Sequence, residues 1–311
     1  MNKKYQQLLD DEVLGFIKHS ASFLPENTAS LPIAQRRAVY NRLCKHFHAG
    51  YPPGVEAQDD LIDAGAHRIP VRRYRSSGST ASAQIIYFHG GGFVIGDLNS
   101  HDDICAEFCD QTGYLVTSVD YRLAPEHIHP AAFNDALAAY RHQCESAGLP
   151  VILAGDSAGA TLAAAVAHAT RTDEVRPVAQ VLIYPALGGD VQRGSYLEHA
   201  HAPMLTTEDM LFYYRAVSGG GEISHDPTFL PLMDADFSGL PPTVIFTADC
   251  DPLRDDGHDY QHKILQAGGQ VEWTNERGLV HGYLRARHSV KRARESFSRI
   301  VGAMNCVECG D

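Results

Sequence analysis

Strand-like apolar runs alternate with helix-like segments from about residue 84 onward, and this alternation limits the possible folds more than any other feature. The expected strands are residues 84–88, 114–121, 151–155, 178–185, 242–248 and 270–275. Several of these runs are almost continuously apolar, as strands buried on both faces usually are. The expected helices are roughly residues 131–147, 158–171, 254–267 and 289–304. The alternation predicts an α/β protein with a mostly parallel central sheet and helices on both faces.

Two segments do not fit this alternation. Residues 1–50 have helical apolar spacing but contain no strand. Residues 190–220 contain "MLTTEDMLFYYRAV", in which Thr206 or Thr207 is suited to cap a helix. We interpret both segments as additions that pack on a single sheet domain. Residues 51–189 and 221–311 form that domain.

Composition excludes several classes of partner. The chain has 311 residues and a net charge of −12, which argues against nucleic acid or an anionic membrane as a main partner. No apolar run reaches the roughly 18 residues of a membrane-spanning helix, and the first residues lack the apolar region of a signal peptide. The seven cysteines are an odd number. We therefore expect a cytoplasmic protein with reduced thiols.

Two local patterns near the end of the chain have ordinary interpretations. The basic stretch 285–294, "RARHSVKRAR", is interpreted as the solvated face of a C-terminal helix rather than a binding patch. Cys306 and Cys309 form a CxxC pair without a second pair in the sequence, so a zinc or redox role is not favoured.

A nucleophile motif follows the third expected strand. Residues 155–159 read Gly-Asp-Ser-Ala-Gly, which matches the Gly-x-Ser-x-Gly pattern of a nucleophile elbow. An apolar strand leads into the motif and an alanine-rich helix leaves it, as the elbow requires. The turn must be so tight that Cβ atoms at Gly155 and Gly159 would collide with the neighbouring strand and helix. Ser157 would then lie at a helix N-terminus, where the helix dipole favours developing negative charge.

A glycine triplet, Gly90 to Gly92, follows the first expected strand and His89. A phosphate loop is not favoured, because Asp97 stands where a Walker loop has lysine, and Ile95 stands where the dinucleotide fingerprint has glycine. In hydrolases with a nucleophile elbow, a loop of this type supplies backbone N–H groups to an oxyanion hole, together with the amide after the nucleophile, here Ala158. We expect His89 to brace the loop by hydrogen bonds rather than to transfer protons.

The acid and the base are expected after the last two strands, because this fold places them in the chain order Ser, Asp or Glu, His. Asp251 precedes a proline, which holds it in an extended loop conformation, and Asp249 is the alternative. Asp255 and Asp256 fit the first turn of the following helix. The expected base is His281, which follows the last strand by about six residues. The other histidines near this end of the sequence, His258, His262 and His288, lie on or near helices.

Five motifs together resemble a known family. HGGGF, DYRLAPE, GDSAG, DPLRDDG and HGY occur in the order and spacing of the bacterial hormone-sensitive-lipase-like (family IV) esterases. The match spans about residues 55–305, and within the family the chain looks most like the acetyl esterases. The resemblance implies an α/β-hydrolase fold, with residues 1–50 and 190–220 as two segments of a helical cap. It implies Ser157 as nucleophile, Asp251 as acid and His281 as base, with oxyanion donors at Gly90, Gly91, Gly92 and Ala158.

The chain departs from the family pattern at a few positions. Tyr283 stands where the family usually has phenylalanine, His129-Pro130 stands for Phe-Pro, and Asp256 stands for glutamate. None of these positions is a proposed nucleophile, acid or base. We interpret Arg122 and Glu126 of the DYRLAPE motif as a buried ion pair that holds their loop.

The expected activity is hydrolysis of short-chain esters, acetyl to butyryl, through an acyl-enzyme and without a cofactor or metal. Phe212, Tyr213 and Tyr214 are candidates for an acyl pocket, although they are equally suited to packing on the sheet alone. A binding protein on a hydrolase scaffold would usually have lost one of the three catalytic residues. An amidase or peptidase would use the same three. The expected partner is a small-molecule ester, and the sequence fits a monomer and a homodimer equally.

Overall fold

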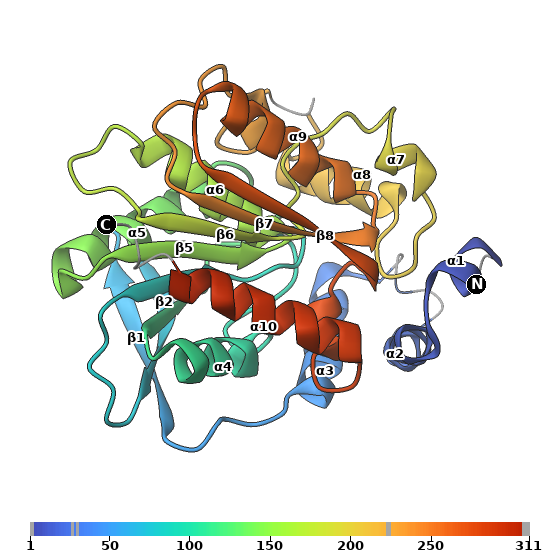
Figure 1. Cartoon of the computed structure of the whole chain (residues 1–311), viewed down its shortest axis with the longest axis horizontal. Helices are drawn as coiled ribbons and strands as arrows, with labels where there is room; N and C mark the ends of the chain where they lie inside the picture. Colours follow the sequence, from blue (N-terminus) through green and yellow to red (C-terminus); the bar gives the residue numbers. More distant parts are fainter. Residues whose placement is uncertain (1–2, 26–27, 29–30, 222–224, 307–311) are drawn as a thin grey trace.

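The structure is a computed structural model, and residues 3–25, 28, 31–221 and 225–306 of it are described. Its centre is a single eight-stranded sheet in the order β1-β2-β4-β3-β5-β6-β7-β8 (Figure 1). The strands are β1 Val55–Asp63, β2 Arg68–Ser76, β3 Gln84–Phe88, β4 Leu115–Val119, β5 Val151–Asp156, β6 Ala179–Ile183, β7 Thr243–Cys250 and β8 Val271–Val280. All neighbouring pairs from β4 to β8 in the sheet are parallel. This confirms the predicted α/β fold with a mostly parallel sheet.

Helices cover both faces of the sheet, and each face has its own apolar core (Figure 1). One core lies beneath α5 Ala131–Ala147, α6 Ala158–Thr170 and α9 Arg254–Gln266. The other lies beneath α4 Asp102–Thr112 and α10 Lys291–Cys306. Four of these helices occupy the predicted positions within two residues, but α4 was not predicted.

The antiparallel strands β1 and β2 were also missed, because their sequences are polar. β2 pairs antiparallel with both β1 and β4, so these two strands form one edge of the sheet. Arginines of β2 pair with acids of β1: Arg72 with Asp59 and Arg73 with Asp60. Charged cross-strand pairs of this kind suit a solvent-facing sheet edge. Because these side chains are charged, β1 and β2 lack the continuous apolar run by which the inner strands were recognised.

The remaining helices gather beyond the carboxyl ends of the parallel strands (Figure 1). They are α1 Lys3–Leu8, α2 Asp11–Ala21, α3 Ile33–Phe47, α7 Ser195–Glu198 and α8 Thr207–Val217. They belong to residues 1–50 and 190–220, the two segments that interrupt the alternation. At the start of α8 the side chain of Thr206 and that of Asp209 each accept from the other residue's backbone amide. Thr206, rather than Thr207, therefore caps this helix.

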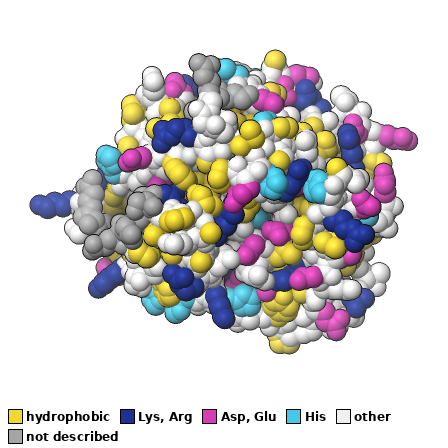
Figure 2. Space-filling view, turned by 180° about the vertical axis from the view of Figure 1, so that it is seen from behind, with side chains coloured by type: hydrophobic (Ala, Val, Ile, Leu, Met, Phe, Trp, Pro, Cys, Tyr) yellow, Lys and Arg dark blue, Asp and Glu magenta, His cyan; other side chains and the backbone are white. Residues whose placement is uncertain are grey.

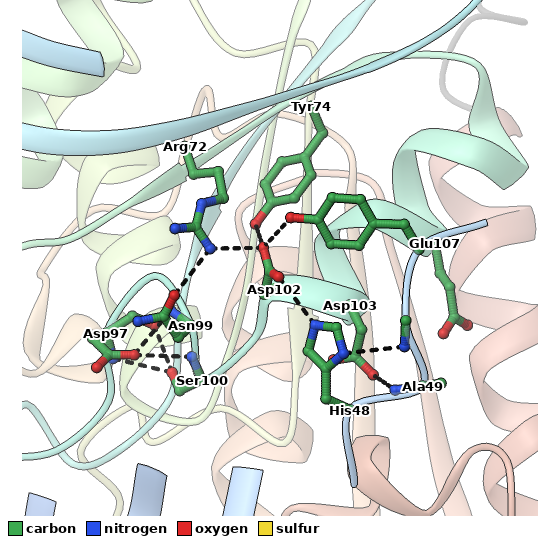
Figure 3. Close-up of polar contacts among 12 residues, drawn as sticks. His48, Ala49, Arg72, Tyr74, Asp97, Asn99, Ser100, Asp102, Asp103 and Glu107 are labelled. Atoms are coloured by element: carbon green, nitrogen blue, oxygen red, sulfur yellow. Dashed lines mark hydrogen bonds and ion pairs between the residues drawn. The ribbon is translucent and has the colours of Figure 1, made fainter. Parts of the chain in front are cut away.

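A buried carboxylate at the start of α4 holds the chain that follows α3 (Figure 3). Asp102 accepts hydrogen bonds from the hydroxyls of Tyr51 and Tyr74 at 2.7 and 2.8 Å, and from Arg72 at 2.9 Å. His48 Nε2 lies 3.0 Å from the other carboxylate oxygen of Asp102. Burial alone would raise the pKa of Asp102, but these four partners lower it. The end of α3 is thus fixed to the sheet domain by a charged group with four partners.

The interpretation of residues 285–294 as a solvated face is wrong for two of its arginines. Arg285 and Arg287 are buried, at 9% and 2% exposure, and both precede the first residue of α10. Arg287 pairs with Asp103 and Glu107 on α4. A sequence pattern alone does not show that acids of an unpredicted helix lie opposite Arg287. Cys309 of the CxxC pair lies outside the described residues, and Cys306 is exposed.

The surface has no single basic region on the face shown in Figure 2, where acidic and basic side chains are interspersed. None of the helices in the described part of the chain is both long enough and apolar enough to span a membrane.

Candidate active site

Ser157 lies in the tight turn between β5 and α6, as the elbow motif predicts. Its backbone has φ 54° and ψ −122°, a conformation that side-chain-bearing residues rarely adopt. Its amide donates to the carbonyl of Ile183 on β6 at 2.8 Å. A Cβ on Gly155 would lie 2.5 Å from the backbone of Gly159, and a Cβ on Gly159 would overlap the carbonyl of Phe88. Both positions therefore require glycine, because a Cβ atom would collide with the neighbouring strand or helix, as predicted from the sequence.

The structure brings Ser157, His281 and Asp251 together. Ser157 Oγ lies 2.9 Å from His281 Nε2, and His281 Nδ1 lies 2.7 Å from Asp251 Oδ2. Asp251 follows β7 and is fully buried, and its other carboxylate oxygen accepts the amide of Leu253 at 2.9 Å. The ring of Tyr184 packs on the imidazole, with centroids 4.7 Å apart. This geometry suits proton transfer from the serine to an imidazole that a carboxylate orients.

The other candidate acids are engaged elsewhere. Asp249 accepts from the side chain of Asn275 and the amide of Gly278, both in β8. Asp255 pairs with Arg254 in the first turn of α9. Asp256 is buried and accepts three consecutive backbone amides, those of residues 187–189, and burial raises its pKa to about 7.

The other candidate histidines also lie away from Ser157. His258 packs on Trp273, His262 contacts Gln266, and His288 pairs with Glu107. His281 is thus the histidine that the structure places beside the serine.

Two glycines of the loop, Gly91 and Gly92 but not Gly90, line the same cavity as Ser157. Gly91 and Gly92 have φ values of 127° and 60°, in the region that favours glycine. Within the described part of the chain, the amides of Gly91, Gly92 and Ala158 donate to no acceptor. The amide of Gly90 instead donates to Asp156 Oδ1 at 2.8 Å. This differs from the sequence prediction, in which Gly90 was also an oxyanion donor.

His89 is buried beneath this loop. Its ring stacks on Tyr121 with centroids 4.4 Å apart, and Tyr121 also donates its hydroxyl to the His89 carbonyl at 2.6 Å. Burial lowers the pKa of His89 to about 4, so the imidazole is neutral at pH 7. His89 Nδ1 lies 2.8 Å from the carbonyl of Gly90, which agrees with the expectation that His89 braces the loop by hydrogen bonds.

A cavity of about 700 Å³ opens beside Ser157 and His281. Its walls include the three aromatic residues proposed for an acyl pocket, Phe212, Tyr213 and Tyr214, and also residues of α3. Tyr213 lies so close to Gly92 that a Cβ on the glycine would overlap its ring. The cavity lies between the sheet domain and the helices of the two inserted segments.

The predicted ion pair of the DYRLAPE motif is wrong, because its two members have different partners. Arg122 binds Asp135 on α5 through Nε and Nη2, at 2.8 to 3.1 Å. Glu126 is half-exposed and pairs with Arg37 on α3 at 2.7 Å. Arg37 also donates to the carbonyls of Val94 and Ala124. The motif therefore connects α3 to the sheet domain, a contact between segments that are distant in the sequence.

Comparison with known proteins shows to which family the chain belongs. A family model described as the α/β hydrolase fold matches residues 85–285, more than half of the chain. The chain belongs to this family. Within the described residues, no three His, Cys, Asp or Glu side chains are grouped so that they could hold a metal ion.

Related proteins place the chain among the esterases of this family. Esterase LipI of Mycobacterium tuberculosis is 38% identical over 82% of the chain and 83% of its own length. The ethyl acetate hydrolase of Pseudomonas putida is 33% identical over 78% of the chain and 80% of its own length. The solved hyperthermophilic esterase of Pyrobaculum calidifontis has a TM-score of 0.89 at 30% identity, over 96% of the chain and 99% of its own. The resemblance to family IV esterases and the classification as a carboxylesterase-type serine hydrolase are confirmed.

One residue that organises this esterase site was missed by the sequence analysis. Asp156 is buried and accepts from Tyr87, Tyr184 and the Gly90 amide, and it lies 3.2 Å from His101 Nε2. Burial alone would raise the pKa of Asp156, but the nearby His101 and these hydrogen bonds hold it well below its usual range. Asp156 thus joins the elbow to the glycine loop. A charged residue at the end of a fully apolar strand is the signal that marks it.

Proposed function

We propose that this α/β hydrolase hydrolyses short-chain carboxylic esters through Ser157, His281 and Asp251. His281 Nε2 takes the proton of Ser157 as Oγ attacks the ester carbonyl, and the imidazolium then gives that proton to the departing alkoxide. Asp251 keeps the Nδ1 proton on the ring and stabilises the imidazolium. A water molecule, deprotonated by His281, then releases the acid from the acyl-serine. The continuous contact from Asp251 through His281 to Ser157 is the observation that carries this proposal.

The oxyanion of the tetrahedral intermediate is assigned to the amides of Gly91, Gly92 and Ala158. These amides have no acceptor among the described residues. Ala158 is the first residue of α6, so the positive end of the helix dipole also stabilises the negative charge of the oxyanion. The Gly90 amide has a different role, since its bond to Asp156 fixes the loop.

The short-chain preference rests on the relatives and on the cavity. Two relatives are described as an ethyl acetate hydrolase and an acetyl-hydrolase, the latter from Streptomyces hygroscopicus. In this chain the ring of Tyr213 lies against Gly92 and narrows the space beside the nucleophile. We propose that residues 1–50 and 190–220 form a cap over the active site, with α8 as the wall that limits acyl length.

The test is hydrolysis of 4-nitrophenyl esters with acyl chains from two to twelve carbons. We expect kcat/KM to be highest at two to four carbons. Equal or rising values at eight carbons and beyond would contradict the short-chain assignment, and no turnover at any length would contradict ester hydrolysis itself. 4-Nitroanilides of the same acids measure amidase activity in parallel, and we expect it to be far weaker.

Replacement of Gly91 with valine should reduce kcat more than it changes KM. A Cβ at this position would overlap the carbonyl of Ile95, and φ of 127° strains any other residue, so the amide would move away from the oxyanion. The loss of one donor costs about 10²- to 10³-fold in kcat. Gly65→Val is the control, because Gly65 has a similar positive φ but open space around it in a surface turn. An unchanged kcat in Gly91→Val would mean that this glycine serves only the turn.

A further inference from the structure

One wall of the cavity contains a buried positive charge that the proposed reaction does not use. Arg285 lies four residues after His281, in the short helix η3 Tyr283–Ala286. Its side chain lines the same cavity as Ser157 but is only 9% exposed.

The hydrogen-bond partners of Arg285 are both uncharged. Its Nη1 donates to the carbonyl of Ser100 at 3.0 Å, and its Nη2 donates to the hydroxyl of Tyr40 at 2.5 Å. The guanidinium also lies over the Tyr40 ring, 4.9 Å from its centroid. No carboxylate within the described ranges forms an ion pair with it. Asp156 acts on Arg285 only through space, because the oxygens of Asp156 are occupied by the donors described above.

Arg287, two residues later, shows what a structural arginine looks like in this protein. It is also buried, but it binds the carboxylates of Asp103 and Glu107 and does not line the cavity. Buried charges in proteins are normally paired in this way, because an unpaired charge is costly to remove from water. Arg287 follows this rule and Arg285 does not.

The free hydrogen-bonding capacity of Arg285 and Tyr40 suits an anion. A guanidinium carries five N–H donors, of which Arg285 uses two. The Tyr40 hydroxyl accepts from Arg285, so its own proton is available to a second acceptor. Tyr40 lines the cavity too, which places both donors within reach of a ligand there. Planar arginine pairs well with a carboxylate, through two parallel hydrogen bonds.

We propose that Arg285 and Tyr40 form a carboxylate-binding subsite, and that the enzyme prefers esters that carry a free carboxylate group. The inference rests on the proposed ester hydrolysis and adds the class of substrate. The ester group lies at Ser157 while the carboxylate of the same molecule replaces the missing anionic partner of Arg285.

The test compares charged and neutral esters of equal length. The first series places the carboxylate on the acyl side, and compares 4-nitrophenyl monoesters of succinic, glutaric and adipic acids with neutral 4-nitrophenyl alkanoates. The second series places the carboxylate on the alcohol side, and compares O-acetyl derivatives of ω-hydroxy acids with acetates of simple alcohols. We expect the charged ester to have the higher kcat/KM in at least one series, which also tells whether the acyl or the alcohol side reaches Arg285. In Arg285→Met this ratio should fall about 10- to 100-fold, since hydrogen bonds between charged groups are lost.

Two further variants keep the result unambiguous. Tyr40→Phe retains Arg285, and the ratio should fall several-fold without a loss of fold, which circular dichroism checks. Arg215→Met removes an exposed arginine from the same cavity, and the ratio should stay within about twofold of the wild-type value because exposed charges are screened. Wild-type enzyme that hydrolyses neutral esters with no preference for charged ones overturns this inference alone. A folded enzyme that hydrolyses no ester overturns the proposed function as well.

Discussion

Replacement of Ser157 with alanine is expected to abolish ester hydrolysis while the protein remains as stable as before. Among the residues that the structure describes, the only side-chain hydrogen-bond partner of Ser157 is His281, so removal of Oγ takes away the nucleophile and little else. Loss of the nucleophile in enzymes of this mechanism lowers kcat by about 10⁶-fold. The lost hydrogen bond changes the free energy of unfolding by about 1 kcal/mol at most. Turnover of 4-nitrophenyl acetate and urea unfolding followed by circular dichroism measure the two effects.

Ser118→Ala is the matched control for this substitution. Ser118 is also a buried serine, but it lies on β4 and does not line the cavity. We expect this variant to keep its turnover within about twofold, because it changes no group near the ester. Ser157→Ala enzyme with turnover within tenfold of the wild type would remove Ser157 from the reaction.

The arrangement of Ser157, Asp251 and His281 was predictable because it depends on chain order and on the sheet. Parallel strands deliver their carboxyl ends to one edge, so the residues that follow β5, β7 and β8 must meet there. Pro252 separated Asp251 from the acids of α9, since it requires an extended residue before it. Each of these signals is local in the sequence, and β5 and β7 are inner, apolar strands of the sheet.

The missed features depend on partners that are distant in the sequence. β1 is polar because its acids face arginines of β2 in the folded sheet. Arg122 and Glu126 stand close together in a motif, yet the fold gives them Asp135 and Arg37 as partners. Arg285 and Arg287 have the same local pattern, but only Arg287 lies opposite acids. The charge balance of a buried residue is set by tertiary contacts, which periodicity and spacing do not encode.

Replacement of Asp251 with asparagine is expected to lower kcat by roughly 10⁴-fold with a much smaller effect on KM. The asparagine amide has nearly the size of the carboxylate, but its N–H₂ would donate to Nδ1 of His281. The ring proton would then stay on Nε2, which lies 2.9 Å from Ser157 Oγ and could no longer accept the serine proton. The imidazolium would also lose its negative partner. Steady-state kinetics with a short-chain ester, together with a thermal unfolding curve, separate this effect from a loss of fold.

Asp255→Asn is the control, because it makes the same chemical change four residues away. Asp255 pairs with Arg254 and accepts the Ser195 amide, and it has no contact with His281. Its pKa is lowered by these partners, against the effect of burial, so the substitution should cost up to about 1 kcal/mol of stability. Its kcat should remain within a few-fold of the wild-type value. The opposite pattern, with kcat lost in Asp255→Asn and retained in Asp251→Asn, would place the carboxylate that orients His281 in α9 and contradict the proposed mechanism.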